Sequence, residues 1–141
     1  MAGDVLDLFH PAVSRWFRES FARPTPPQLE GWPRIAAGQN TLILAPTGSG
    51  KTLAAFLFAI HELVSRSSDP SSEAHGVHTL YVSPMKALAN DIERNLNGPL
   101  TGVRVSAEQM GMKLPEISVG LRPGDTPSSE RQKMVEDRRI S

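Results

Sequence analysis

The chain has 141 residues and no cysteine, and its 15 lysines and arginines balance 15 aspartates and glutamates. This length suits about one domain, and the lack of cysteine excludes disulfides, thiol catalysis and thiolate metal sites. A net charge of zero gives no overall electrostatic footprint for nucleic acid, although a local basic strip remains compatible with it. The sequence shows neither a secretory signal nor an apolar run long enough to cross a bilayer, so we expect a cytoplasmic protein without membrane contact.

The first part of the chain predicts two helices. Apolar residues recur at helical spacing between residues 11 and 21. A second helix is expected to begin at Thr25, with proline in the first helical position and Gln28 as the capping-box partner, and to end at Gly38. Residues 1–38 therefore form an N-terminal helical segment.

The rest of the chain alternates between predicted strands and helices. In chain order, the expected elements are a strand at 41–45, a helix at 51–64, a strand at 77–83, helices at 85–96 and 100–112, a strand at 116–121 and a short charged helix from 126. Strands that alternate with helices predict an α/β fold with a parallel sheet built from right-handed crossovers.

The stretch APTGSGKT, which joins the first predicted strand to its helix, has the composition of a phosphate-binding loop. Gly48 and Gly50 permit backbone angles that a side chain would block, and the amides at a helix N-terminus attract anions. Lys51 suits the β- and γ-phosphates of a nucleotide, and the Thr52 hydroxyl suits Mg²⁺. Ala45 stands where the general pattern has glycine, which is tolerable if its φ stays negative. The alternative is a glycine-rich turn that binds nothing.

Gln28 admits two interpretations. Its amide can donate and accept at once, which suits the N6/N7 edge of adenine. It can equally serve only as the capping-box partner of its own helix. The pattern of residues leaves both interpretations open.

Four segments in order resemble the Q motif and motifs I, Ia and Ib of superfamily 2 DEAD/DEAH-box helicases. They are FARPTPPQ, APTGSGKT, SPMKALA and VGLRPGDT. Two longer stretches resemble the large helicase-related (Lhr-type) proteins more closely: residues 8–56, which include the phosphate-binding loop, and LYVSPMKALANDIERNL. The resemblance implies that residues 39–141 are part of a RecA-like P-loop NTPase domain with an incomplete sheet and flanking helices.

The resemblance also implies a role for each matching residue. For ATP and Mg²⁺, the implied residues are Thr25, Gln28, Thr47, Gly48, Ser49, Gly50, Lys51 and Thr52, of which Lys51 and Thr52 also serve catalysis and Thr52 ligates the metal. For one strand of nucleic acid, they are Ser83, Pro84, Lys86, Ala87, Arg122, Gly124 and Thr126. From the residues alone, a solvated lysine in the first turn of a helix is the favoured interpretation of Lys86. A helix-capping turn around Asp125 and Thr126 remains an alternative to DNA contact.

The sequence therefore predicts the N-terminal portion of an ATP-dependent helicase or translocase. Its implied partners are single-stranded or partly duplex DNA, with RNA possible, and the remainder of the helicase in the same or a separate chain. The sequence contains neither D-E-x-H nor D-E-x-D, so we expect this chain alone to bind nucleotide without hydrolysing it. The alternatives are a non-catalytic helicase remnant that binds nucleotide or nucleic acid and a small P-loop kinase or GTPase.

Overall fold

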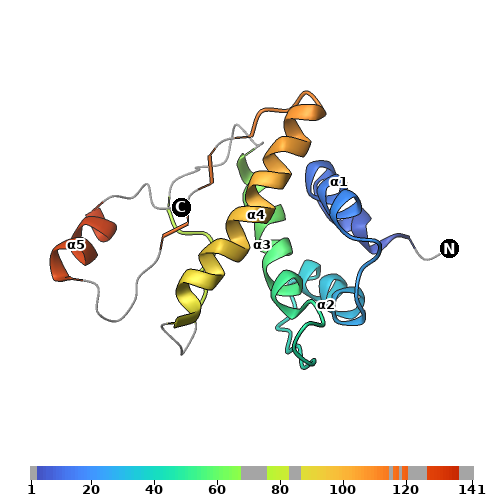
Figure 1. Ribbon diagram of the computed structural model, residues 1–141, viewed down its shortest axis with the longest axis horizontal. Coiled ribbons are helices and arrows are strands. Elements are labelled where there is room, and N and C mark those ends of the chain that lie inside the picture. Colours follow the sequence, from blue (N-terminus) through green and yellow to red (C-terminus); the bar gives the residue numbers. More distant parts are fainter. Residues whose placement is uncertain are drawn as a thin grey trace.

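The computed structural model describes residues 3–67, 76–82, 87–114, 116–117, 119–120 and 127–136. Its helices are η1 (Val5–Leu8), α1 (Pro11–Ser20), α2 (Pro26–Ala36), α3 (Lys51–Ser67), α4 (Ala87–Gln109) and α5 (Ser128–Glu136). The helices α1, α2 and α4 gather around α3, whereas α5 lies apart from them (Figure 1). The two helices predicted in the N-terminal segment and the short charged helix near residue 128 are confirmed.

Side chains and glycines define the ends of the N-terminal helices. The Nδ1 atom of His10 accepts a hydrogen bond from the Ala12 amide at 3.2 Å and caps α1. Gly38 adopts a φ of 73° after the last turn of α2, and the next amide, that of Gln39, donates to the Arg34 carbonyl at 3.0 Å. A glycine in this conformation ends a helix with its carbonyls satisfied, as the sequence predicted for Gly38.

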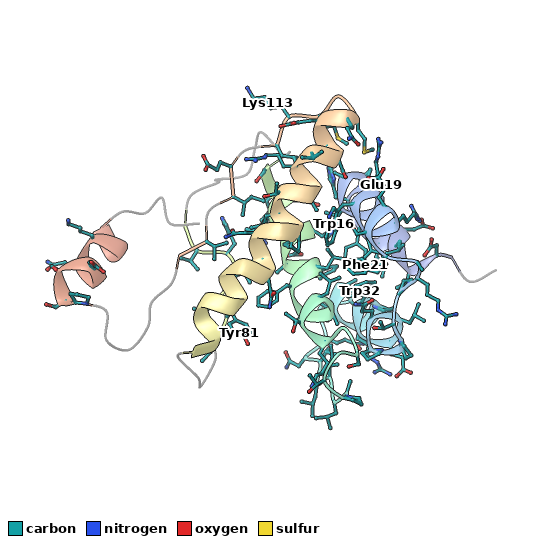
Figure 2. The ribbon with its side chains drawn as sticks, in the orientation of Figure 1. Trp16, Glu19, Phe21, Trp32, Tyr81 and Lys113 are labelled. Atoms are coloured by element: carbon teal, nitrogen blue, oxygen red, sulfur yellow. The ribbon has the colours of Figure 1, made fainter. Side chains whose placement is uncertain are left out.

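The core consists of helix side chains packed on an aromatic centre. Trp32 of α2 is fully buried, and its ring meets Phe9 and Phe17 edge to face at centroid distances of 4.9 and 5.5 Å. Figure 2 places Trp32 beside α3. The buried apolar residues of this core are Leu6, Phe9, Ala12, Val13, Phe17, Trp32, Leu57, Ile60, Val64, Val103 and Ala107. The N-terminal segment therefore shares one core with α3 and α4.

Residues 87–109 form one continuous helix, although the sequence predicted separate helices at 85–96 and 100–112. Pro99 lies inside α4, where it removes one amide donor without ending the helix. The helix ends at Gln109, two residues before Gly111, whose φ is 76°. The amide of Met112 then donates to the Ala107 carbonyl at 2.8 Å. Packing of α4 against α1 stabilises this helix and outweighs the local cost of the proline.

The predicted parallel sheet is the main correction to the sequence-based fold. Among the described residues, none of 41–46, 77–82, 116–117 and 119–120 belongs to a strand, and the first two segments are extended without a hydrogen-bonded neighbour. An extended backbone becomes a strand only when a neighbour pairs with its amides and carbonyls. Within the described residues, the structure therefore shows the helices of the predicted α/β fold but not its sheet.

The first extended segment is covered on one face only. Ile43 faces α2, where a Cβ atom on Gly31 would lie 3.1 Å from its Cδ1 atom. Its neighbours Leu42 and Leu44 point the other way and are 82% and 85% exposed. In the second segment Tyr81 reaches α3 and contacts Phe56 at a ring-centroid distance of 5.0 Å. Both segments thus lie against the helical core and leave apolar side chains in solvent.

Candidate nucleotide-binding site

The loop between the first extended segment and α3 has the backbone geometry that its glycines predict. Residues 47–50 form a turn in which Gly48 and Gly50 have φ values of 81° and 82°. No described residue other than glycine has a positive φ, so Ala45 meets the condition set by the sequence. The substitution of alanine for the usual first glycine is therefore compatible with the turn.

Most amides of this loop are free to bind a ligand. Within the loop, Ser49 donates to the Pro46 carbonyl through its amide at 3.2 Å and through its hydroxyl at 2.5 Å. Among the described residues, no acceptor faces the amides of residues 47, 48 and 50–53. Unpaired donors at the start of the 17-residue helix α3 carry the positive end of its dipole. The loop can therefore bind an anion through its backbone.

Lys51 and Thr52 begin α3 with exposed side chains. In the part of the chain that the structure describes, no carboxylate forms an ion pair with the Lys51 ammonium group. No three histidine, aspartate or glutamate side chains of that part cluster as metal ligands. A charge without a protein partner, next to unpaired amides and a hydroxyl, suits a phosphate group.

Gln28 connects the start of α2 to this loop. Its Oε1 atom accepts a hydrogen bond from the Thr25 amide at 3.0 Å, and its Nε2 atom donates to the Gly50 carbonyl at 3.3 Å. These two partners fix the orientation of an amide that is 3% exposed. The capping interaction expected for Gln28 is thus confirmed, and one N–H and one lone pair of the amide remain for a ligand.

Thr25 lies beside the same carbonyl. A Cβ atom on Gly50 would lie 3.0 Å from the Thr25 Oγ1 atom and 2.6 Å from the Gln28 Nε2 atom, so glycine is the residue that fits there. The Thr25 hydroxyl is buried beside the Gln28 amide in the capping box, and no atom within the described ranges accepts its hydrogen. A buried hydroxyl without a partner costs free energy, which a ligand at this place would recover.

Trp32 also contacts the first turns of α3, a contact that was not predicted from the sequence. Its indole N–H donates to the Ala54 carbonyl at 3.1 Å. The one signal in the sequence was the spacing of Gln28 and Trp32, which places both on one face of α2. The helix that carries the capping box therefore binds α3 at two points.

The predicted nucleic-acid residues fall almost wholly outside the described part of the chain. Those outside it are Ser83, Pro84, Lys86, Arg122, Gly124 and Thr126. Ala87 is the first residue of α4, and the structure describes its backbone alone. These assignments remain predictions.

Comparison with known proteins identifies the family. The model of the DEAD/DEAH box helicase family matches residues 25–138. The chain belongs to this helicase family. The match begins at Thr25, so it includes α2, the phosphate-binding loop and α3. The alternative of a small P-loop kinase or GTPase is therefore wrong.

Individual relatives are Lhr-type helicases. The chain is 52% identical over 132 residues to an "Lhr helicase/ probable uracil glycosylase" of Mycolicibacterium smegmatis, and this match covers 94% of the chain and 9% of that protein. It is 48% identical to "ATP-dependent helicase Lhr-Core protein 2" of Thermococcus barophilus, with 94% of the chain and 15% of the relative covered. The resemblance to Lhr-type helicases is confirmed.

A solved structure shares the arrangement of the chain. It is described as "Structure of Mycobacterium smegmatis helicase Lhr bound to ssDNA and AMP-PNP" and matches with a TM-score of 0.86 and 49% sequence identity. The match covers 98% of this chain and 17% of the other. The chain thus spans well under a fifth of the length of these relatives.

Proposed function

We propose that this chain is the ATP-binding N-terminal portion of an ATP-dependent DNA helicase or translocase. The phosphate-binding loop and α3 hold the nucleotide with Mg²⁺, and residues around the start of α4 contact one DNA strand. Membership of the DEAD/DEAH box helicase family supports nucleotide-driven work on nucleic acid in general. The similar Lhr structure, whose description names ssDNA and AMP-PNP, favours DNA and an adenine nucleotide.

The observation that carries this proposal is that, among the described residues, the amides of residues 47, 48 and 50–53 have no acceptor and the Lys51 ammonium group has no carboxylate partner. A polyphosphate requires several donors that converge without competing internal bonds. The positive φ values of Gly48 and Gly50 provide the turn that such a loop needs. The residues present therefore fit the phosphates of ATP.

Each residue has a separate task in this proposal. Thr47, Gly48 and Gly50 supply backbone donors, and Ser49 holds the phosphate-binding turn through its bonds to the Pro46 carbonyl. Lys51 neutralises the β- and γ-phosphates, and the Thr52 hydroxyl ligates Mg²⁺. The remaining hydrogen-bonding capacity of Gln28, with the unpaired Thr25 hydroxyl, recognises adenine. Bound Mg²⁺ would draw charge from the phosphates and so favour phosphoryl transfer.

Contact with DNA depends on the second group of residues. Ser83, Pro84, Lys86 and Ala87 immediately precede or begin α4, and a helix N-terminus offers donors to a backbone phosphate. Arg122, Gly124 and Thr126 provide a second contact. The remainder of the helicase, in this polypeptide or another, would complete the nucleotide site and the path of the strand.

Titration with a fluorescent ADP analogue and Mg²⁺ tests the nucleotide site. We expect Lys51→Ala to weaken binding at least about tenfold, because a charge-assisted contact is lost. The matched control is Lys113→Ala, an exposed lysine beyond α4 and far from the loop (Figure 2), which should bind like the parent chain. Equal affinity of the parent chain and Lys51→Ala would refute the proposed site.

The same samples separate binding from turnover. We expect ATP hydrolysis by the parent chain to equal that of Lys51→Ala, because the sequence carries no D-E-x-H or D-E-x-D motif. Hydrolysis above that control would show that this chain contains a complete catalytic site. Addition of single-stranded DNA should leave the rate unchanged and tighten nucleotide binding if the two sites are coupled.

A further inference from the structure

Two side chains of α2 contact α3 in the same register. Gln28 and Trp32 lie one turn apart on α2, and the carbonyls that they reach, those of Gly50 and Ala54, are also four residues apart. The Ala54 amide donates to the Gly50 carbonyl at 2.9 Å, so that carbonyl accepts from both α2 and α3. The start of the phosphate-binding helix is thus held at two successive turns.

The Gly50 carbonyl matters because of the amide that shares its peptide plane. The carbonyl of Gly50 and the N–H of Lys51 belong to one planar trans peptide and point in opposite directions. Donors from α2 and α3 that fix the direction of this carbonyl therefore also fix the direction of the Lys51 amide. This amide is one of those without an acceptor among the described residues.

Trp32 is suited to hold this arrangement rigidly. Its side chain is fully buried, and the rings of Phe9 and Phe17 contact it edge to face. Phe9 follows η1 and Phe17 belongs to α1, so the indole N–H is fixed by elements that precede the capping box. Gln28 is 3% exposed and is held in turn by the Thr25 amide.

We infer that Trp32 and Gln28 are positioning residues that align the Gly50–Lys51 peptide with the phosphates of the nucleotide. The inference rests on the proposed function, since it deepens the role of the same loop. The role of Trp32 requires no contact with the ligand, because the indole acts through the Ala54 carbonyl and the first turn of α3. The segment before residue 25 would thereby influence phosphate affinity.

The test uses Trp32→Phe, which removes the indole N–H and keeps an aromatic ring. The matched control is Trp16→Phe, since Trp16 lies between α1 and α4 and makes no hydrogen bond to α3 within the described residues. Gln28→Met is a second variant that removes the other donor at similar length. Each chain is titrated with Mg–pyrophosphate in competition with a labelled nucleotide, and amide exchange at Ala54 is followed without ligand.

We expect Trp32→Phe and Gln28→Met to weaken pyrophosphate binding on the order of fivefold and to speed exchange at Ala54 by a similar factor. Pyrophosphate has no base, so a change in the affinity of the chain for pyrophosphate reflects phosphate binding by the loop and not adenine recognition. Trp16→Phe should change neither quantity. The inference would be overturned if amide exchange at Ala54 and pyrophosphate affinity stayed at parent values in both test variants. It would also be overturned if both quantities changed equally in Trp16→Phe.

The two proposals fail in different ways. Should Lys51→Ala bind nucleotide as well as the parent chain, the proposed function fails, and exchange at Ala54 still decides whether α2 positions the peptide. Should Lys51→Ala lose binding while Trp32→Phe and Gln28→Met keep parent affinity for pyrophosphate, the loop binds phosphate without help from α2 and only the inference fails.

Discussion

The helical core and the extended segments of this chain contain similar residues in opposite surroundings. Leu57 of α3 is fully buried, whereas Leu44, just before the phosphate-binding loop, is 85% exposed. A helix satisfies its backbone hydrogen bonds within itself and needs only one apolar face to be covered. An extended segment needs a neighbour for its backbone as well as for its side chains. Helices can therefore form where the corresponding sheet does not.

The helical core that stabilises the molecule and the loop proposed to bind phosphate therefore lie next to each other. The phosphate-binding loop joins an extended segment that lacks a paired neighbour to a helix that is anchored in the core. Its geometry consequently depends on the helical side of the junction, through Gln28 and Trp32. Four experiments sharpen the comparison between the two regions.

The largest expected effect is the difference between two leucines given the same substitution. Leu57→Ala should lower the free energy of unfolding by about 2–5 kcal/mol, because it leaves a cavity in the core. Leu44→Ala should change it by less than about 0.5 kcal/mol, because its side chain is already in solvent. Urea denaturation of both variants measures the difference. Equal losses would mean that the 41–46 segment is buried in solution.

A smaller loss is expected where α1 crosses α4. A Cβ atom on Gly102 would lie 2.1 Å from the indole Nε1 atom of Trp16, within a rigid ring that cannot easily bend away. Gly102→Ala should therefore cost about 1–3 kcal/mol through overpacking. Thermal unfolding of Gly102→Ala, of Trp16→Leu and of the double variant forms a cycle in which the leucine should relieve much of the cost. If the losses of stability in the two single variants simply added in the double variant, α1 and α4 would be packed more loosely at this contact than the structure indicates.

Two histidines make the junction of α1 and α3 sensitive to acid. The His10 amide donates to the Nδ1 atom of His61 at 2.7 Å, while the Nδ1 atom of His10 caps α1. Burial lowers the pKa of both rings below the usual 6.5, and in His61 the charge of Glu62 opposes this shift while that of His10 adds to it. Both rings must stay unprotonated at Nδ1 to accept these bonds.

Stability should therefore fall as the solution is acidified. Because the folded pKa values lie below those of the unfolded chain, the contribution is complete above about pH 6.5 and is lost as the pH falls through the folded values. Urea midpoints measured between about pH 7.5 and 5.5 should decline. His61→Gln combined with His10→Asn, which keeps an N-cap, should flatten the decline. If the urea midpoint of this double variant still declined with pH as in the parent chain, the decline would come from other titratable groups.

The smallest effect on folding, with a clear effect on association, is expected in the extended segments. Leu44→Lys should leave the free energy of unfolding within about 0.5 kcal/mol of the parent. It should also raise the concentration at which light scattering detects oligomers, because a charge on an unpaired extended segment opposes edge-to-edge pairing. Leu8→Lys adds the same charge to η1 and serves as the control. A similar change in both variants would indicate a general charge effect.

Much of the helical structure and of the loop could be predicted from local signals. Thr25 and Gln28 begin α2, Gly38 follows its end, and the glycines of the loop have the expected positive φ values. The continuity of α4 through Pro99 could not be predicted, because contact with α1 outweighs the local signal to stop. Nor could the bond from Trp32 to Ala54, since it depends on how two helices lie against each other.

The sequence by itself determined where α1 and α2 begin and end, which residues supply the phosphate-binding loop and which family motifs the chain carries. Those features depend on hydrogen bonds and backbone angles within a few residues of one another. Only the tertiary structure decided that the apolar runs at 41–46 and 77–82 have no paired strand among the described residues and that α2 holds the Gly50 carbonyl. Such features depend on partners distant in the chain, whose positions local patterns do not specify.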